Sequence, residues 1–167
     1  MKQTLQKKRA LLLENIHADA VSLLSSHGFV VETHTKAMSE ADLLKAIQGV
    51  SYLGIRSKTK VTRAVVEAAD VLECIGAFCI GTNQIDLAAC TKKGIAVFNA
   101  PYSNTRSVVE LVVGEIIMLL RKAVDKSVGA HHGEWDKSAT GCFEMRGKKL
   151  GIVGYGNIGS QLSVVAE

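Results

Sequence analysis

The stretch from residue 50 to residue 75 decides the fold, and it reads VSYLGIRSKTKVTRAVVEAADVLECI. It opens with the apolar run Val50–Ile55, which is followed by a polar loop and a helix-like segment over Val61–Ala69. A second apolar run, Val71–Ile75, comes next. Parallel strands need a long crossover connection, which is usually a helix. The stretch therefore predicts two parallel strands joined by a helix.

The same alternation extends in both directions from this stretch. Short apolar runs begin near positions 10, 29, 50, 71 and 95, and a helix-like segment follows each of them. The repeated units share no side-chain motif, which excludes a solenoid. An alternation of strands and helices with this period is typical of a parallel sheet covered by helices. We therefore predict an α/β fold.

Local signals mark the helix boundaries. A helix over His17–Ser26 is expected to end at Gly28, and Gly94 is expected to end a helix over Ile85–Lys93. Ser39 precedes Asp42 in the pattern of a capping box, which predicts a helix start at that point. That helix is expected to stop at Gly49.

Composition excludes several classes of protein. The chain is 47% hydrophobic and 22% charged, with 15 Gly and one Pro, which is too apolar for a disordered chain. The richest apolar stretch, Val108–Leu120, is interrupted by two glutamates and is shorter than the roughly 18 residues of a membrane span. The apolar run Ala10–Leu13 is too short for a cleavable signal, which favours a cytoplasmic protein.

Charge and cysteine content give little sign of unusual partners. The net charge is +4, but Lys2, Lys7, Lys8 and Arg9 lie in the first ten residues, and the rest of the chain is neutral. Nucleic-acid binders usually carry a basic stripe over the fold, and this neutral remainder shows no such stripe. We therefore expect no nucleic-acid partner. The four cysteines form no CxxC pair, and no metal site is predicted.

A glycine motif lies near the end of the sequence. The single proline, Pro101, is expected in a turn before a long helix over about Thr105–Lys126, inside which Gly114 suggests close packing. A short strand over Leu150–Val153 is expected to run into Gly154-Tyr155-Gly156-Asn157-Ile158-Gly159, and a helix over 160–167 follows.

A strand, this spacing of glycines and a helix are the context that a dinucleotide site requires. Gly154 permits the tight turn, Gly156 lets the backbone approach a pyrophosphate, and Gly159 lets the helix pack closely. The alternative is a glycine-rich turn without a ligand. The acid that would distinguish NAD from NADP is expected near 175–180, outside the sequence, about 20 residues beyond the glycines.

Polar groups also follow the third and fourth predicted strands. Arg56-Ser57-Lys58-Thr59 is either a site for a carboxylate or a solvated basic loop, since Arg offers a planar fork to such anions. In the loop from Gly76 to Asp86, Gly81 and Thr82 are candidates to present backbone N–H groups to an anion. Asp86 is expected to cap the next helix, and residues 82–84 are interpreted as turn residues.

The remaining candidates have open interpretations. Ser103 or Asn104 is a helix cap, or Asn104 faces a substrate hydroxyl. The five histidines have no acid at the spacing of a triad, so we interpret them as structural or solvated. Trp135 is either buried at a subunit interface or packed on its own domain.

Four blocks of sequence closely resemble the D-isomer-specific 2-hydroxyacid dehydrogenase family, and the likeness covers essentially the whole chain. The blocks are Gly54–Ser57, Phe78–Asp86, Phe98–Val108 and Gly147–Gly156. The resemblance is to the N-terminal part of the members that oxidise 3-phospho-D-glycerate to 3-phosphohydroxypyruvate with NAD, the first step of L-serine biosynthesis. It implies a flavodoxin-like substrate domain over residues 1–98 and the beginning of a Rossmann NAD-binding domain over 99–167.

The resemblance also implies roles for single residues. Arg56 and Ser57 match family positions that grip the substrate, and Asn104 matches a position close to the substrate and the nicotinamide. Lys58 and Lys137 are weaker candidates for charge at the phosphate end. With Gly81, whose candidacy comes from its own loop, Arg56, Ser57 and Asn104 are the predicted substrate-binding residues. Residues 154–159 match the NAD-binding loop, with Asn157 and Ile158 at the pyrophosphate. The family implies a homo-oligomer, in which residues 127–146 form an arm that contacts the other subunit.

In the family, the catalytic Arg, Glu and His follow the third glycine by many tens of residues, whereas the sequence extends eight residues past Gly159. We therefore expect the 167 residues alone to lack dehydrogenase activity, and residues 1–98 to be more stable than the segment after 127. Two alternatives remain open at this point. The chain belongs to a dehydrogenase of another D-2-hydroxy acid, or it is an inactive chain that only associates or binds ligand weakly.

Overall fold

A computed structural model of the protein describes residues 8–167, so the basic residues Lys2 and Lys7 lie outside the described part. The chain divides after Pro101 into two compact units, one ending at that residue and the other spanning Tyr102–Glu167. Among residues 8–167, no helix combines the length and the apolar character that crossing a membrane requires.

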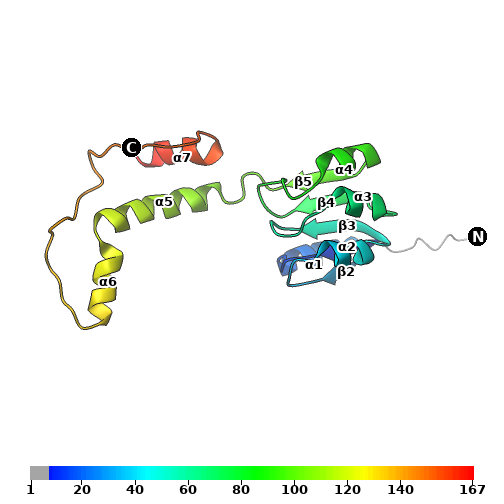
Figure 1. The fold of residues 1–167 in the computed structure, drawn as a ribbon, viewed down its shortest axis with the longest axis horizontal. Coiled ribbons are helices and arrows are strands. Elements are labelled where there is room, and N and C mark those ends of the chain that lie inside the picture. The colour runs from blue at the N-terminus through cyan, green and yellow to red at the C-terminus, as the bar shows by residue number, and fades with distance from the viewer. Residues whose placement is uncertain (1–7) are drawn as a thin grey trace, which may run out of the picture. The chain divides into compact units, whose positions relative to one another are not determined.

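The first unit is a five-stranded parallel sheet with helical crossovers (Figure 1). The strand order is β2-β1-β3-β4-β5, which is the flavodoxin-like order and confirms the predicted fold class. The strands are β1 Arg9–Leu12, β2 Val30–Thr33, β3 Val50–Ile55, β4 Cys74–Ala77 and β5 Ala96–Asn99. The helices are α1 Ala18–Ser26, α2 Glu40–Ala46, α3 Arg63–Ala68 and α4 Leu87–Lys93.

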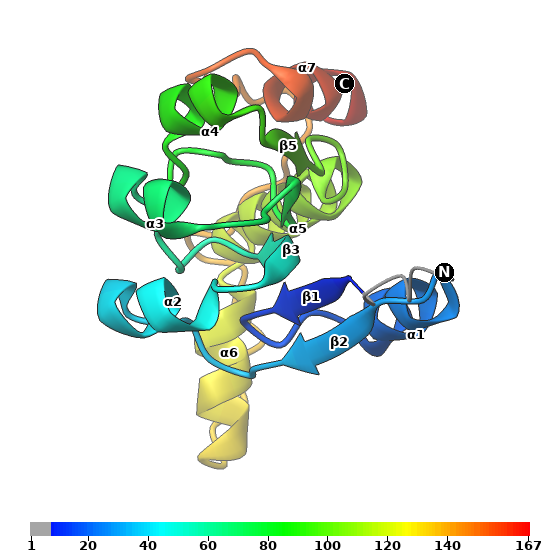
Figure 2. The same ribbon diagram turned by 90° about the vertical axis from the view of Figure 1, so that its right-hand side faces the viewer.

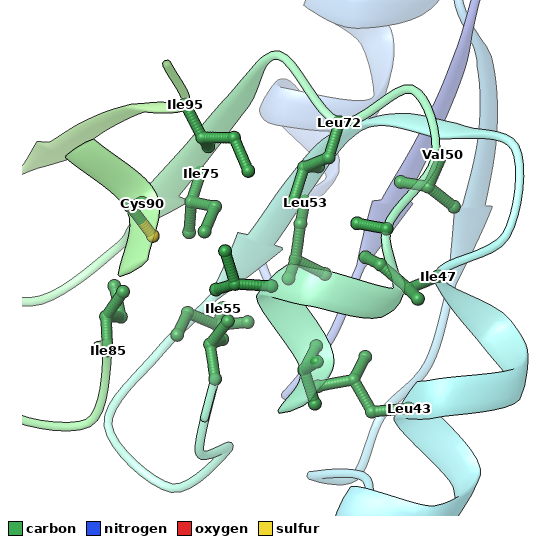
Figure 3. Packing of buried hydrophobic residues seen from close by; sticks show 14 of the residues in the cluster. Leu43, Ile47, Val50, Leu53, Ile55, Leu72, Ile75, Ile85, Cys90 and Ile95 are labelled. Atoms are coloured by element: carbon green, nitrogen blue, oxygen red, sulfur yellow. The ribbon is translucent and has the colours of Figure 1, made fainter. Parts of the chain in front are cut away.

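Helices cover both faces of this sheet. Figure 2 shows α2, α3 and α4 on one side of the strands and α1 on the other. The register places Leu11, Leu53, Ile75 and Val97 in one row across four strands. The first three of these are buried and pack with side chains of α2, α3 and α4, such as Leu43 (Figure 3). Each such side chain contributes roughly 1.5–3 kcal/mol of burial free energy.

Glycines on two central strands make room for large side chains. A Cβ at Gly54 would lie 2.5 Å from Leu12 Cδ2, and one at Gly76 would lie 2.2 Å from the Tyr52 hydroxyl oxygen. A larger residue at either position would therefore have to displace the end of the neighbouring side chain, because real Cβ atoms do not approach other atoms so closely.

The predicted caps are present. Ser39 accepts a hydrogen bond from the Asp42 N–H, and Asp86 accepts one from the Ala89 N–H at the start of α4. Gly94 ends α4 in the left-handed region. The largest boundary error in this unit is the fourth strand, which begins at Cys74 rather than Val71, where the chain still bends after α3. The helices predicted from Val61 and Ile85 each begin two residues later, at Arg63 and Leu87.

The second unit contains α5 Thr105–Leu120, α6 Ala123–His131 and α7 Asn157–Val165. The long helix predicted over 105–126 is broken, because Lys122 has a left-handed backbone with φ of 52°. At this point the Leu120 carbonyl oxygen accepts the Phe143 N–H at 2.8 Å, so the returning chain satisfies a carbonyl that the helix leaves open. Close packing at Gly114 was also wrongly predicted: no heavy atom of the described residues would meet its Cβ within 4 Å.

The strand predicted over Leu150–Val153 does not form. A strand is defined by ladder hydrogen bonds, and no other segment of the described second unit pairs with these residues. The helix after the glycines starts earlier than predicted, at Asn157, and ends at Val165. It packs on α5, where Val109 and Leu162 are the buried apolar side chains.

Candidate functional site

The carboxyl ends of β1 and β3 form the point at which the strand order reverses. The chain leaves β1 toward β2 on one side and then returns past β1 to β3 on the other. Ligands of open parallel sheets bind in the crevice at such a switch point. The segment that follows β3 here is Arg56-Ser57-Lys58-Thr59, so the topology selects the basic loop as the candidate site.

Two clefts open at this edge, and Arg56 lines both. The smaller, of about 330 Å³, is lined by Glu14, Thr35, Lys36, Arg56, Ser57 and Lys58. The larger, of about 640 Å³, is lined among others by Asn15, His17, His34 and Phe78. The lining of the smaller cleft therefore includes three cationic side chains and one carboxylate. This balance suits an anionic ligand.

Lys36 is the cleft residue that the sequence patterns missed. It lies just after β2, and its backbone oxygen accepts the Glu14 N–H at 3.3 Å. Once the strand order is known, the switch-point rule points to Lys36, because it follows β2, the strand beside β1. A lysine in a polar loop carries no such signal by itself.

The backbone of the Arg56 loop is held by a single carboxylate, which the patterns also missed. Glu14 Oε1 accepts the N–H of Arg56 at 3.2 Å and of Thr59 at 2.8 Å, and Oε2 accepts that of Lys58 at 3.0 Å. Burial raises the pKa of this carboxyl, but the hydrogen bonds from Thr59, Lys58 and Arg56 outweigh it, so the pKa lies below its ordinary value. Glu14 is therefore ionised at neutral pH.

A second tie joins the Arg56 loop to the Gly81 loop. Gln84 Nε2 donates to the Arg56 carbonyl oxygen at 2.9 Å and to the Gly81 carbonyl oxygen at 3.2 Å. The Val61 N–H donates to the Gln84 carbonyl oxygen at 2.8 Å, which adds a backbone link. The structural interpretation of Gln84 is thus confirmed, and its amide does more than form a turn. It connects the two loops that carry the substrate-binding candidates Arg56 and Gly81.

Four of the histidines make local contacts, among them His27, whose Nδ1 lies 2.8 Å from the Leu23 carbonyl oxygen. His17 caps α1, because its Nδ1 accepts the Asp19 N–H at 3.3 Å. His34 Nε2 lies 2.9 Å from Glu32 Oε1, and His131 Nδ1 lies 2.8 Å from the Ser127 carbonyl oxygen. These contacts bear out the structural interpretation, although His17 and His34 also line the larger cleft.

The glycine loop of the second unit leads directly into α7. Gly154 has φ of 91°, which confirms the tight turn. A Cβ at Gly159 would lie 2.2 Å from the Gly154 carbonyl oxygen, which confirms the close approach. No heavy atom of the described residues would lie within 4 Å of a Cβ at Gly156, the N-cap of α7, apart from its chain neighbours. The first N–H groups of a helix have no partner within it, so this end suits a phosphate.

Two further candidates lie in the second unit. Asn104 occupies the N-cap position of α5, but its side chain makes no capping hydrogen bond and is exposed. The indole of Trp135 is 79% exposed, so it is not packed on its own unit. The subunit-interface interpretation of Trp135 stays a prediction.

Comparison with known proteins adds a consistent result. A family model described as D-isomer specific 2-hydroxyacid dehydrogenase, catalytic domain, matches residues 10–162. A protein of Schizosaccharomyces pombe named putative D-3-phosphoglycerate dehydrogenase is 58% identical over 95% of this chain and 34% of its own length. The D-3-phosphoglycerate dehydrogenase of Escherichia coli K12 is 50% identical over 96% of this chain and 40% of its own length.

The fold comparison agrees with the sequence comparison. The crystal structure of D-lactate dehydrogenase from Aquifex aeolicus, complexed with NAD and lactic acid, superposes with a TM-score of 0.80 at 20% identity. The match covers 94% of this chain and 47% of that one. This identity supports the fold alone. The chain spans about a third to two-fifths of the length of the curated relatives described above.

Proposed function

Because the chain belongs to the D-isomer-specific 2-hydroxyacid dehydrogenase family, an NAD-dependent group of oxidoreductases, we propose that it takes part in oxidising 3-phospho-D-glycerate. The product would be 3-phosphohydroxypyruvate, and the first unit would bind the substrate. Two relatives at 58% and 50% identity carry the name D-3-phosphoglycerate dehydrogenase, which supports this substrate over other 2-hydroxy acids.

The observation that carries the proposal is the cationic cleft at the switch point. 3-Phosphoglycerate has a carboxylate at one end and a phosphate at the other, and the smaller cleft holds Lys36, Arg56 and Lys58. Arg56 would grip an anionic end through its planar fork, and the two lysines would supply point charge. Ser57 would add a hydroxyl donor, and a Gly81 N–H would be a further donor to an anionic group.

The second unit would bind the nicotinamide dinucleotide through Gly154, Tyr155, Gly156, Asn157, Ile158 and Gly159. The open space at Gly156 fits a group that approaches the backbone closely, and the first N–H groups of α7 would face the pyrophosphate. A bound nicotinamide would supply the hydride acceptor for this oxidation, and the hydroxyl proton would leave to a base outside these 167 residues. Asn104 would face the substrate hydroxyl, because its side chain makes no capping hydrogen bond to α5.

We propose a small-molecule substrate, a cytoplasmic location and a homo-oligomer on the strength of the family alone. In that assembly, residues 127–146 would contact the other subunit, and exposed Trp135 would be buried there.

The test is steady-state kinetics of the protein that carries this sequence, with 3-phosphoglycerate, glycerate and D-lactate as substrates. The phosphorylated acid is expected to have the highest kcat/KM, because it alone uses the additional cations of the cleft. Arg56→Lys keeps the charge but loses the fork, so KM for 3-phosphoglycerate should rise by about ten-fold or more.

The matched control is Arg63→Lys, an exposed arginine on α3 that lines neither cleft at the switch point. Its KM should stay at the wild-type value. A preference for D-lactate or glycerate, or equal KM values for the two variants, would contradict the proposed substrate site.

A further inference from the structure

Glu14 lies directly after β1 in an unusual backbone conformation. It and Asn15 have φ of 62° and 54°, in the left-handed region that residues other than glycine rarely adopt. Two such residues in succession cost free energy and persist only where the surroundings determine them. Here the Glu14 N–H donates to the Lys36 carbonyl oxygen and the Asn15 N–H to the His34 carbonyl oxygen at 3.1 Å. The turn aims the Glu14 side chain at the Arg56 loop.

The carboxylate is placed where it would oppose the proposed ligand. Glu14 is 8% exposed and contributes the one negative charge to a cleft with three cations. A carboxylate in that position weakens the attraction of an anionic substrate. Its presence therefore calls for a compensating role. That role is visible in its hydrogen bonds, since both oxygens are used by backbone N–H groups of the loop.

No neutral side chain could replace these contacts one for one. Two N–H groups converge on Oε1 and one on Oε2, so both atoms act as acceptors. In glutamine one of these atoms becomes an NH₂ donor, which would face a loop N–H. Among residues 8–167, one other side chain bonds to the backbone of this loop, namely Gln84, whose amide donates to the Arg56 carbonyl oxygen. The amide cannot take over the N–H groups that Glu14 accepts.

We propose that Glu14 is a positioning residue, whose carboxylate fixes the backbone of Arg56–Thr59 so that the Arg56 and Lys58 side chains are held ready at the cleft. This inference rests on the proposed function, because it assigns the loop a substrate to receive. Glu14 itself does not bind the substrate. It acts by keeping the loop ordered, and the ordered loop in turn raises the affinity for the substrate.

The experiment combines amide hydrogen exchange with kinetics on Glu14→Gln in the whole protein. The N–H groups of Arg56, Lys58 and Thr59 should exchange at least about ten-fold faster than in the wild type, while those of β3 keep their rates. KM for 3-phosphoglycerate should rise by about ten-fold with a smaller change in kcat. A merely structural role would accelerate β3 together with the loop and leave KM unchanged.

The control is Glu67→Gln, which removes the charge of an exposed glutamate on α3 that lines neither cleft at the switch point. It should leave both readouts unchanged. Where Glu14→Gln does not fold, Glu14→Asp serves, because the acid is kept but is one methylene too short to reach all three N–H groups. The same acceleration of the loop amides is expected.

The outcomes separate the two proposals. Turnover of 3-phosphoglycerate by the wild type, with unchanged loop exchange and KM in the Glu14 variant, would overturn the role of Glu14. Faster loop exchange in the variant, with no action of the wild type on 3-phosphoglycerate, would contradict the proposed substrate and still support Glu14 as the residue that orders the loop.

Discussion

Two alanine substitutions in the glycine loop separate a role in binding from a role in packing. At Gly156 the backbone has φ of −86°, which alanine adopts without strain, and no described heavy atom beyond its chain neighbours would meet the new methyl group within 4 Å. Gly156→Ala should therefore change the free energy of unfolding by less than about 0.5 kcal/mol. The methyl group would occupy only the space that we assign to the pyrophosphate.

The size of the binding defect follows from that geometry. A methyl group at Gly156 would push the pyrophosphate away from the first N–H groups of α7. Loss of one charge-assisted hydrogen bond costs roughly 2 kcal/mol, and the Kd for NAD should rise by about 30-fold. The assay is titration of NAD or NADH by calorimetry, with thermal unfolding of the same samples.

Gly159→Ala is the matched comparison. Its Cβ would lie 2.2 Å from the Gly154 carbonyl oxygen, whereas real Cβ contacts are not shorter than 3.0 Å, so the start of α7 must move. Overpacking of this kind costs about 1–3 kcal/mol, and the amides of α7 should exchange faster. Unchanged NAD affinity in Gly156→Ala, together with wild-type stability, would refute the assignment of this loop to the cofactor.

Three further predictions concern the first unit. Leu53→Ala removes a fully buried side chain from the central strand and should lower the free energy of unfolding by about 2–5 kcal/mol, measured by denaturant titration; a loss below 1 kcal/mol would contradict the described core. Lys93 donates to the carbonyl oxygens of Val66, Glu67 and Ala69 at the end of α3. Lys93→Met should therefore lower the free energy of unfolding by roughly 1 kcal/mol in the same titration. An unchanged free energy of unfolding would mean that these hydrogen bonds do not stabilise the fold. The pKa of Glu14 is lower in the folded chain than its ordinary value of 4.5, so its contribution to stability is present above that value and is lost as the pH falls through the folded pKa. Comparing pH-dependent unfolding of the wild type with Glu14→Gln measures this loss, and identical slopes would exclude it.

Local patterns were enough to predict most of the first unit. Val50–Ile55 was predicted to the residue, because this short, mostly apolar run lies between a helix end marked by Gly49 and the polar loop that starts at Arg56. The caps at Ser39 and Asp86 followed from side-chain chemistry that acts within three residues. The start of β4 was predicted three residues too early, because Val71 and Leu72 are apolar but precede the first residue that pairs with β3.

Long-range contacts account for what the sequence could not predict. Glu14 and Lys36 line the same cleft as Arg56, although they follow two other strands and lie 42 and 20 positions before it along the chain. A pattern read along the chain cannot tell which polar residue after a strand faces its neighbours. The break after α5 has a similar cause, because the Leu120 carbonyl oxygen is satisfied by Phe143. The predicted strand at Leu150–Val153 failed for lack of a ladder partner in the described residues.

The most direct test of the account is a crystal structure of the protein carrying this sequence with NAD and 3-phosphoglycerate bound. The account predicts the pyrophosphate against Gly156 and the N–H groups of Asn157 and Ile158, with an anionic end of the substrate on the Arg56 guanidinium. A cofactor bound away from the glycine loop, or a substrate that leaves Arg56 without contact, would contradict it.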